Sequence, residues 1–299
     1  MTLDELDQDV ERFTLDCPRI PHAELFPQVW DDWRHVEKLL DGRQNLKDRA
    51  HLMLLGGQFT YFLARLSFNM GEYGAARRHA VLAWHYADDV GQPVLCASVR
   101  TLQGTIAFYA GHHQKALELL QAAEPYQTRY SRPRIAANRA RAYSVLGEDS
   151  KARQALIEME RALVEVRPQP GDAPYTTATA LSALASTLTR LGDGAAADEH
   201  ARQAVALHNA PGVAGTLFED RGNATLNLAS SLVVRVRPEP EEAARLGIQA
   251  IAVPEGQRTE TVRTRAVELL RLLDGWRGTA AVQDFAERLH QYELPIPTT

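Results

Sequence analysis

The sequence predicts an all-α protein built from repeated helix pairs, and three observations lead to that fold class. Runs that alternate apolar and polar residues, the pattern of half-buried strands, are nearly absent. The one cluster of β-branched residues, Ser231 to Arg237, continues a helical pattern from upstream. Breaks that contain Gly, Pro or Asp recur roughly every 15 to 25 residues, a regularity that is typical of structural repeats.

The N-terminal part of the chain, residues 1–56, is expected to form a helical cap that leads into the first repeat. Two helices are predicted within residues 3–16 and 24–42, and the apolar segment 44–68 continues into the repeats. Terminal units of stacked repeats are atypical because one of their faces meets water. The cap is therefore not expected to follow the repeat pattern.

Residues 57–209 are predicted to contain four repeats, each aligned on a turn glycine: Gly71, Gly111, Gly147 and Gly192. Alanine follows each glycine by five residues: Ala76, Ala116, Ala152 and Ala197. A small residue precedes each by seven: Ala64, Gly104, Ala140 and Ala185. Twelve residues after the glycines stand Ala83, Ala123, Met159 and Ala204. Two antiparallel helices approach closely only where one side of their contact is small, so these positions are predicted to lie between helices.

Residues 210–299 are expected to hold a degenerate fifth pair and C-terminal capping helices, so that the whole chain forms one continuous domain. In the fifth pair, 218–236 and 238–253, the sequence RPEP replaces the turn glycine. A final pair is predicted within 259–292.

The aligned small residues resemble the tetratricopeptide repeat, a helix-turn-helix unit of about 34 residues. The resemblance is clear from Gly57 to Ala204 and implies a right-handed α-superhelix, or solenoid, of helix pairs. The turn glycines lie 40, 36 and 45 residues apart, which is longer than the standard spacing. The Pro- and Gly-containing stretch 166–174 accounts for the longest interval.

The order of segments over almost the whole chain resembles the C-terminal effector region of actinobacterial regulators with an N-terminal Cro/repressor-type helix-turn-helix. It is carried by the segments LFPQVWDDWRHVEKLLDGRQ, LLGGQFTYFLARLSFNMGEYGAARRHAVLAWHYADDVGQP and WRGTAAVQDFAERL. Met1 stands only a few residues before this region, so DNA binding is not carried over to this chain. Either the sequence is truncated or the chain is a stand-alone sensor or adaptor. The resemblance also implies a possible homodimer.

Composition and charge limit the classes of function. The formal net charge is −5, without long blocks of one sign, whereas a DNA-binding domain normally presents a basic surface. Cys17 and Cys96 are too few for a disulfide framework and have no metal-ligand spacing. The acidic N-terminus lacks the pattern of a signal peptide, and no run of about 18 apolar residues is present. We expect a cytoplasmic protein that binds neither membrane nor nucleic acid directly.

The motifs of common enzymes are missing from the sequence. It contains no phosphate-binding glycine loop, Gly-x-Ser-x-Gly elbow or His-Glu-x-x-His zinc motif. His112 and His113 are neighbours in a turn, where their rings would point apart, and His79 and His85 lie on different faces of one helix. We therefore expect no enzyme activity, no metal and no cofactor.

A ligand is expected on the first helix of each pair, because these helices line the concave groove of a superhelix. Counting by helical period from the small positions gives these candidates: Gln58, Tyr61, Arg65, Asn69, Arg100, Thr101, Phe108, Tyr109, Arg134, Asn138, Arg141, Arg190 and Asn227. Asparagine suits the backbone groups of a peptide, and arginine suits carboxylates. The predicted function is a sensor module for a peptide, a small-molecule effector or a protein partner, and the resemblance implies a role in transcriptional regulation. The alternative is a constitutive adaptor scaffold without a small ligand.

Overall fold

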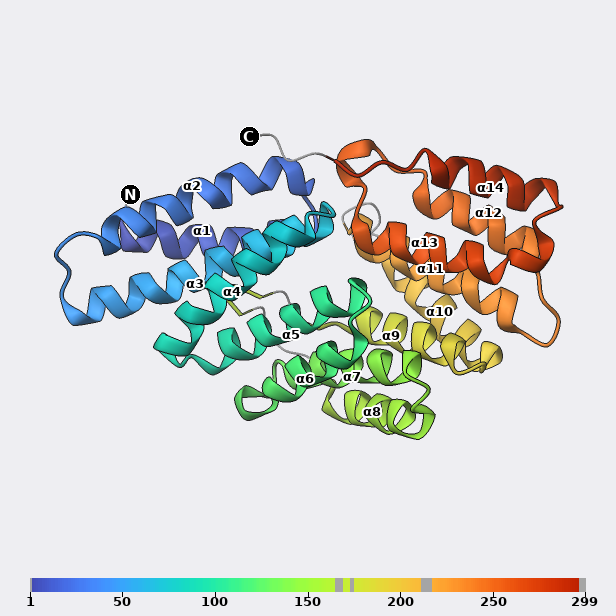
Figure 1. Ribbon diagram of the computed structural model, residues 1–299, viewed down its shortest axis with the longest axis horizontal. Helices are drawn as coiled ribbons and strands as arrows, with labels where there is room; N and C mark the ends of the chain where they lie inside the picture. The colour runs from blue at the N-terminus through green and yellow to red at the C-terminus, as the bar shows by residue number, and fades with distance from the viewer. Residues whose placement is uncertain (1, 165–168, 173–174, 211–216, 296–299) are drawn as a thin grey trace. The chain divides into compact units, whose positions relative to one another are not determined.

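The computed structural model describes residues 2–164, 169–172, 175–210 and 217–295. Within these ranges the chain forms fourteen α-helices and three short 3-10 turns, and no β-strand is present (Figure 1). The only extended pairing among them is an isolated bridge between Gln169 and Asp172. The prediction of an all-α fold is confirmed.

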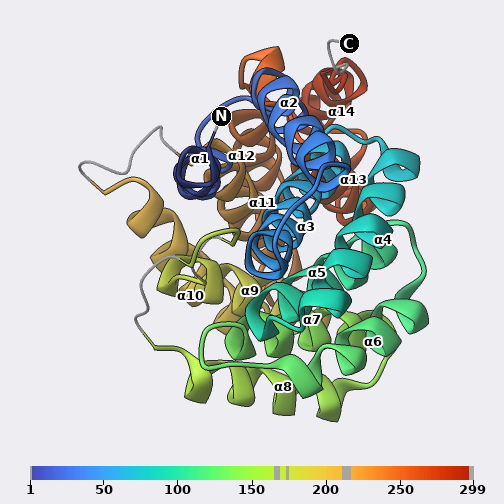
Figure 2. The same cartoon turned by 90° about the vertical axis from the view of Figure 1, so that its left-hand side faces the viewer.

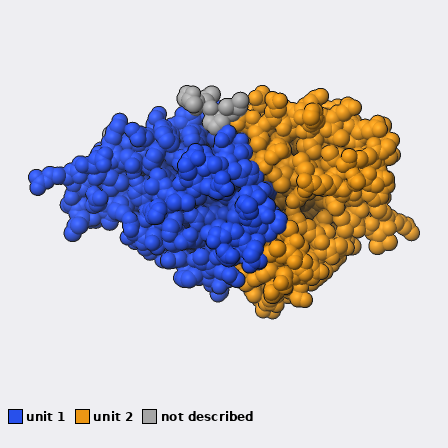
Figure 3. Space-filling view, viewed as in Figure 1, with its two compact units in different colours: residues 1–138, 164–175, 296–299 blue, residues 139–163, 176–295 orange. Residues whose placement is uncertain are grey.

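The chain divides into two compact units, which Figure 3 shows in different colours. Unit 1 comprises residues 1–138, 164–175 and 296–299, and unit 2 comprises 139–163 and 176–295. The boundary between residues 138 and 139 falls inside the helix Arg132–Val145, labelled α7. The expectation of one continuous domain stays a prediction.

Unit 1 begins with the predicted N-terminal helices and continues into two helix pairs. Its helices are α1 (Leu3–Asp16), α2 (His22–Leu40), α3 (Leu46–Asn69), α4 (Tyr73–Val90), α5 (Pro93–Tyr109), α6 (His113–Ala122) and the first part of α7. α3 packs against α1, α2, α4 and α5, and α5 packs against α6; these helices can be followed in Figure 2. Since α3 is one helix of 24 residues, the N-terminal segment enters the first pair without a break. In its core, the ring of Phe13 meets Phe59 and Phe62 edge to face.

Unit 2 consists of further helix pairs that follow the end of α7. Its helices are α8 (Asp149–Ala162), α9 (Thr177–Arg190), α10 (Gly194–His208), α11 (Phe218–Val234), α12 (Pro240–Ile251), α13 (Glu260–Leu272) and α14 (Ala280–His290). α9 packs against α10, α11 against α12, and the first helices α9, α11 and α13 are successive neighbours. α11 ends at Val234 and α12 begins at Pro240, so the connection between them contains the first three residues of the RPEP sequence.

The four aligned glycines end the first helix of their pairs. All have positive φ angles, between 74° and 83°, a region that favours glycine. At the first of these turns, the amide of Gly71 donates to the carbonyl of Phe68, and the amide of Glu72 donates to that of Ser67. This is the Schellman arrangement, which satisfies the last carbonyl groups of a helix. The glycine therefore sets the sharp reversal within each pair.

The aligned small positions lie between helices, as predicted. Apart from Gly104, the eleven residues at the three offsets from the turn glycines all have 0% exposure. They include Met159, the one larger residue of the alignment. At Gly104 an added Cβ would lie 3.0 Å from Cγ of Leu120 in the paired helix α6. Small side chains at these positions thus allow the helix backbones to approach closely.

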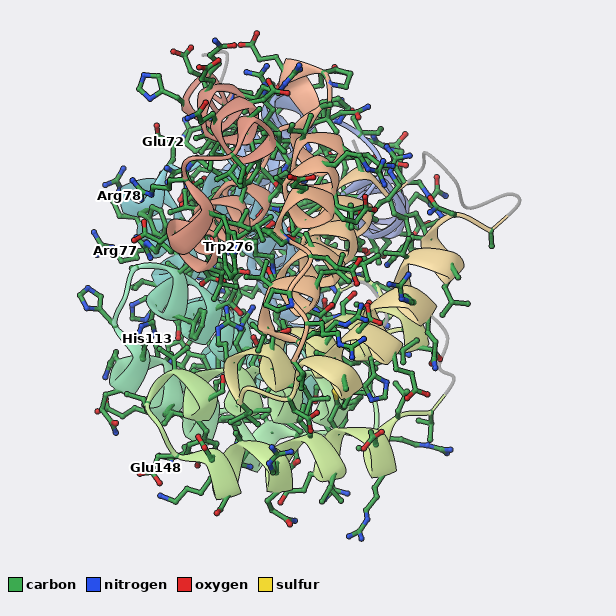
Figure 4. All side chains as sticks on the ribbon, turned by 90° about the vertical axis from the view of Figure 1, so that its right-hand side faces the viewer. Glu72, Arg77, Arg78, His113, Glu148 and Trp276 are labelled. Carbon is green, nitrogen blue, oxygen red and sulfur yellow. The ribbon has the colours of Figure 1, made fainter. Side chains whose placement is uncertain are left out.

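Exposed charged side chains stand at or near the start of two of the second helices. Arg77 and Arg78 near the start of α4 are exposed and project away from the ribbon, and so does Glu148 before α8 (Figure 4). Cys17 and Cys96 are buried free thiols. No helix in the described part of the chain has both the length and the apolar character needed to cross a bilayer.

Candidate functional site

A tight turn in unit 1, residues 169–172, is held by the first helices of that unit. The amide of Asp172 donates to the carbonyl of Gln169 at 3.0 Å, which closes a four-residue β-turn. Pro170 supplies the fixed φ of the second position, and Gly171 has a φ of 91° at the third. This combination is that of a type II turn. The local sequence Gln-Pro-Gly-Asp thus determines the shape of the segment.

The carboxylate of Asp172 is buried among donors from three separate elements. Arg134 Nη1 donates to Oδ1 at 2.6 Å, and the Tyr61 hydroxyl donates to the same oxygen at 3.1 Å. The Ser98 hydroxyl donates to Oδ2 at 2.6 Å. The residue is 2% exposed, so the donors replace water around its charge. We call Asp172 and its partners Tyr61, Ser98, Tyr130 and Arg134 the Asp172 cluster.

The backbone of the turn is also bound by side chains. Gln58 Nε2 donates to the carbonyl of Pro170 at 3.0 Å, and the Tyr130 hydroxyl donates to the carbonyl of Asp172 at 2.6 Å. The amide of Gly171 donates to the hydroxyl of Thr14 at 2.9 Å. The amide of Gln169 also donates to the Tyr130 hydroxyl at 3.4 Å. Side chains of unit 1 therefore bind two backbone carbonyls, two amides and one carboxylate within this short segment.

Local sequence explains how these side chains come to face the turn. Gln58, Tyr61 and Arg65 are spaced by three and four residues on α3 and therefore share one helix face. Tyr130 precedes α7 in a loop where the amide of Thr128 donates to the Ser131 hydroxyl. The small Gly171 is required as well, since a Cβ at this position would lie 2.8 Å from Cγ of Gln58.

The electrostatics of the cluster favour a bound carboxylate. Burial and the neighbouring Asp172 carboxylate raise the pKa of the Tyr61 phenol, so it remains a hydrogen donor. The same two causes raise the pKa of Tyr130 to about 12. Burial lowers the pKa of Arg134, but the Asp172 carboxylate together with the phenols of Tyr61 and Tyr130 outweighs it, and the net shift is upward. The positive charge of Arg65 also acts on Tyr61, Tyr130 and Arg134.

The other predicted site residues of unit 1 lie in different surroundings. The guanidinium of Arg100 stacks on the ring of Trp84, with its carbon 3.3 Å from the ring centroid. Asn138 donates to the carbonyl of Arg134 and accepts from Thr105. Of the remaining predicted residues, Asn69 is buried and Thr101 donates to the carbonyl of Ala97. The rings of Phe108 and Tyr109 lie next to each other.

The predicted residues of unit 2 belong to a second polar group on its first helices. Arg190 Nη2 lies 2.7 Å from Oε2 of Glu268, and Arg265 Nη1 donates to Oδ1 of Asn227 at 2.6 Å. Asn227 in turn donates to the carbonyl of Ser182. Burial raises the pKa of Glu268. The charges of Arg190 and Arg265, with a smaller effect from Arg141, together lower it by more, so the net shift is downward.

Sequence reasoning missed the acidic partners and several donors of both groups. Asp172 was treated as part of a spacer between repeats, and Ser98, Tyr130, Thr14, Arg265 and Glu268 were not candidates. Ser98 lies three residues before Thr101 on α5, so helical spacing contained a signal for it. Asp172 lies 74 residues from Ser98, and no local pattern indicates that contact.

No protein-family model matches the chain, and no match among curated proteins was found. Among the described residues, no group of three or more His, Cys, Asp or Glu side chains is placed to hold a metal ion. His112, one half of the predicted histidine turn, is exposed.

Proposed function

We propose that this chain is a non-enzymatic regulatory module that binds a peptide on the inner face formed by the first helices of its pairs. The helix pairs stack, in this proposal, as a right-handed solenoid of tetratricopeptide type. Its candidate ligand-contacting side chains are those that unit 1 directs to the turn 169–172.

The observation that carries the proposal is the binding of a non-helical segment by residues expected to contact a ligand. Helical spacing alone predicts Gln58, Tyr61 and Arg134 as ligand contacts, and all three donate hydrogen bonds to residues 170 and 172. An amide that donates to a backbone carbonyl fits any peptide, whereas a guanidinium selects for a carboxylate. The donor set therefore matches a short peptide chain better than an apolar effector.

The regulatory part of the proposal comes from the resemblance to actinobacterial regulators. Binding changes the behaviour of such a module only if the peptide prefers one arrangement of the helices over another. A DNA-binding partner, in the same chain or in another, would then respond to that arrangement.

Selection of peptides from a random library tests the proposal. We expect the chain to enrich peptides with an acidic residue or a free C-terminus, and their binding to fall at least about tenfold in Tyr61→Phe and Arg134→Met variants. Arg132→Met is the control, because Arg132 is exposed and lies only two residues from Arg134.

Selected peptides that bind all variants equally would contradict the proposal. Protein capture that is independent of Tyr61 and Arg134, together with no peptide enrichment, would favour the alternative of a constitutive adaptor scaffold.

A further inference from the structure

We propose that the Asp172 cluster is a carboxylate-binding subsite for a peptide, and that residues 169–172 occupy it as an internal stand-in for that ligand. This inference rests on the proposed function and specifies its ligand chemistry and its control. The ligand has a backbone carbonyl for Gln58 and, two residues later, a carboxylate for Tyr61, Ser98 and Arg134.

The contacts of the turn resemble recognition of a ligand more than packing of a loop. Every named contact of the turn is a hydrogen bond to a backbone group or to the Asp172 carboxylate. Gln169 and Pro170 remain exposed. The turn thus buries little apolar surface, and polar recognition accounts for its position.

Arg134 and Arg65 both act on the cluster, and Asp172 is the carboxylate that the hydrogen bonds place in it. Without that carboxylate, the Arg134 guanidinium and the hydroxyls of Tyr61 and Ser98 would lose the acceptor that they share. A second carboxylate of the same geometry would restore these bonds, and a carboxylate away from water is stable only where such donors surround it.

An internal occupant of the subsite lowers the apparent affinity of an external ligand. A segment of the same chain is present at an effective concentration in the millimolar range. A peptide in solution must replace it, so its apparent dissociation constant increases by the reciprocal of the fraction of empty sites. The internal segment would therefore set the ligand concentration at which the module responds.

The test uses the chain's own segment as the external probe. A synthetic peptide with the sequence of residues 167–174, RPQPGDAP, is acetylated and amidated so that its Asp side chain is its single carboxylate. Binding is measured by calorimetry to the full chain and to an Asp172→Ala variant. We expect the variant to bind at least about tenfold more tightly than the unmodified chain.

Two matched controls identify the contact. A peptide with Asn in place of its Asp should bind the Asp172→Ala variant at least about tenfold more weakly. Adding Arg134→Met to that variant should abolish the difference between the two peptides. If Asp172→Ala does not fold, Asp172→Asn, which keeps the shape of the side chain, replaces it.

Equal affinity of the unmodified chain and the variant, or equal affinity for the Asp and Asn peptides, would overturn the inference. The proposed function fails separately. If library-selected peptides still require Tyr61 and Arg134 while Asp172→Ala changes nothing, the module binds peptides and only the role of the internal segment is wrong.

Discussion

Arg134 and Asp172 are 38 residues apart in the sequence, and their side chains form a hydrogen-bonded ion pair of 2.6 Å. The carboxylate is almost fully buried, and the side chain of Arg134 is 19% exposed. A charge pair in such a place is stable only when both partners are present and their remaining groups are hydrogen-bonded. Tyr61 and Ser98 supply those further bonds to the carboxylate.

Removing the arginine alone should destabilise the protein more than removing both charges. Arg134→Met leaves the Asp172 carboxylate buried without its cation, and we expect the free energy of unfolding to fall by about 2 to 3 kcal/mol. The double variant Arg134→Met, Asp172→Asn should recover part of that loss. Urea unfolding of the two variants and of the exposed control Arg132→Met measures this. A double variant less stable than Arg134→Met would contradict the account.

The turn conformation predicts a difference between two glycines. Gly171 and Gly192 both have positive φ, but a Cβ at Gly192 has no atom within 4 Å, whereas at Gly171 it meets Gln58. Gly192→Ala should therefore cost only backbone strain, about 1 kcal/mol. Gly171→Ala should also release the segment, so hydrogen exchange at the amide of Asp172 should become at least about tenfold faster. Unchanged exchange in Gly171→Ala would show that the contact with Gln58 does not hold the turn.

The helix-pair packing was largely predictable from sequence, because it depends on short intervals along the chain. The alignment on turn glycines identified Ala76, Ala116, Ala152 and Ala197, all of which are fully buried. Side chains at fixed offsets within one hairpin meet through local geometry. This is the part of the fold for which a single sequence carries enough information.

The same reasoning predicts that the alanine positions do not tolerate larger residues. Ala197 in α10 is fully buried, whereas Ala195 in the same helix is exposed. Ala197→Leu should destabilise the protein by about 1 to 3 kcal/mol, because it forces the paired helices apart. Ala195→Leu should change the stability by less than about 0.5 kcal/mol. Equal effects of the two substitutions in thermal unfolding would show that close helix approach is not required there.

The candidate site was only half predictable. Helical spacing placed Gln58, Tyr61 and Arg134 on the correct faces, because it fixes the direction of a side chain within its own helix. It gave no information on the Pro-Gly-Asp segment, which lies 111 residues from Tyr61. A contact between a helix face and a distant turn is decided by the tertiary arrangement, so the acidic partner became visible only in the structure.

Stability should depend on pH through Asp32 in α2. Burial, with the nearby charge of Asp9, raises the pKa of Asp32 to about 6. The charge of Asp31 also raises this pKa, and the charge of Arg12 lowers it. Because the folded pKa is above the unfolded value, the folded state binds the proton more tightly, and stability falls as pH rises from about 4 to 6. Asp32→Asn should thus be more stable than the unmodified chain at pH 7.5 and similar at pH 4.

Since Asp32 is only partly buried, solvent screening reduces the expected gain to about 1 kcal/mol. Urea midpoints at the two pH values measure it, with the exposed Asp31→Asn as a control for which a smaller change is expected. A gain of equal size at both pH values would contradict the assignment to Asp32.

The central claim is that a peptide carboxylate binds where Asp172 lies, and a crystal structure of the Asp172→Ala variant with the peptide RPQPGDAP tests it most directly. We predict that the peptide's Asp carboxylate lies within about 3.2 Å of Arg134 Nη1 and of the Ser98 hydroxyl. A peptide bound elsewhere, with Tyr61, Ser98 and Arg134 facing only solvent or one another, would contradict the claim.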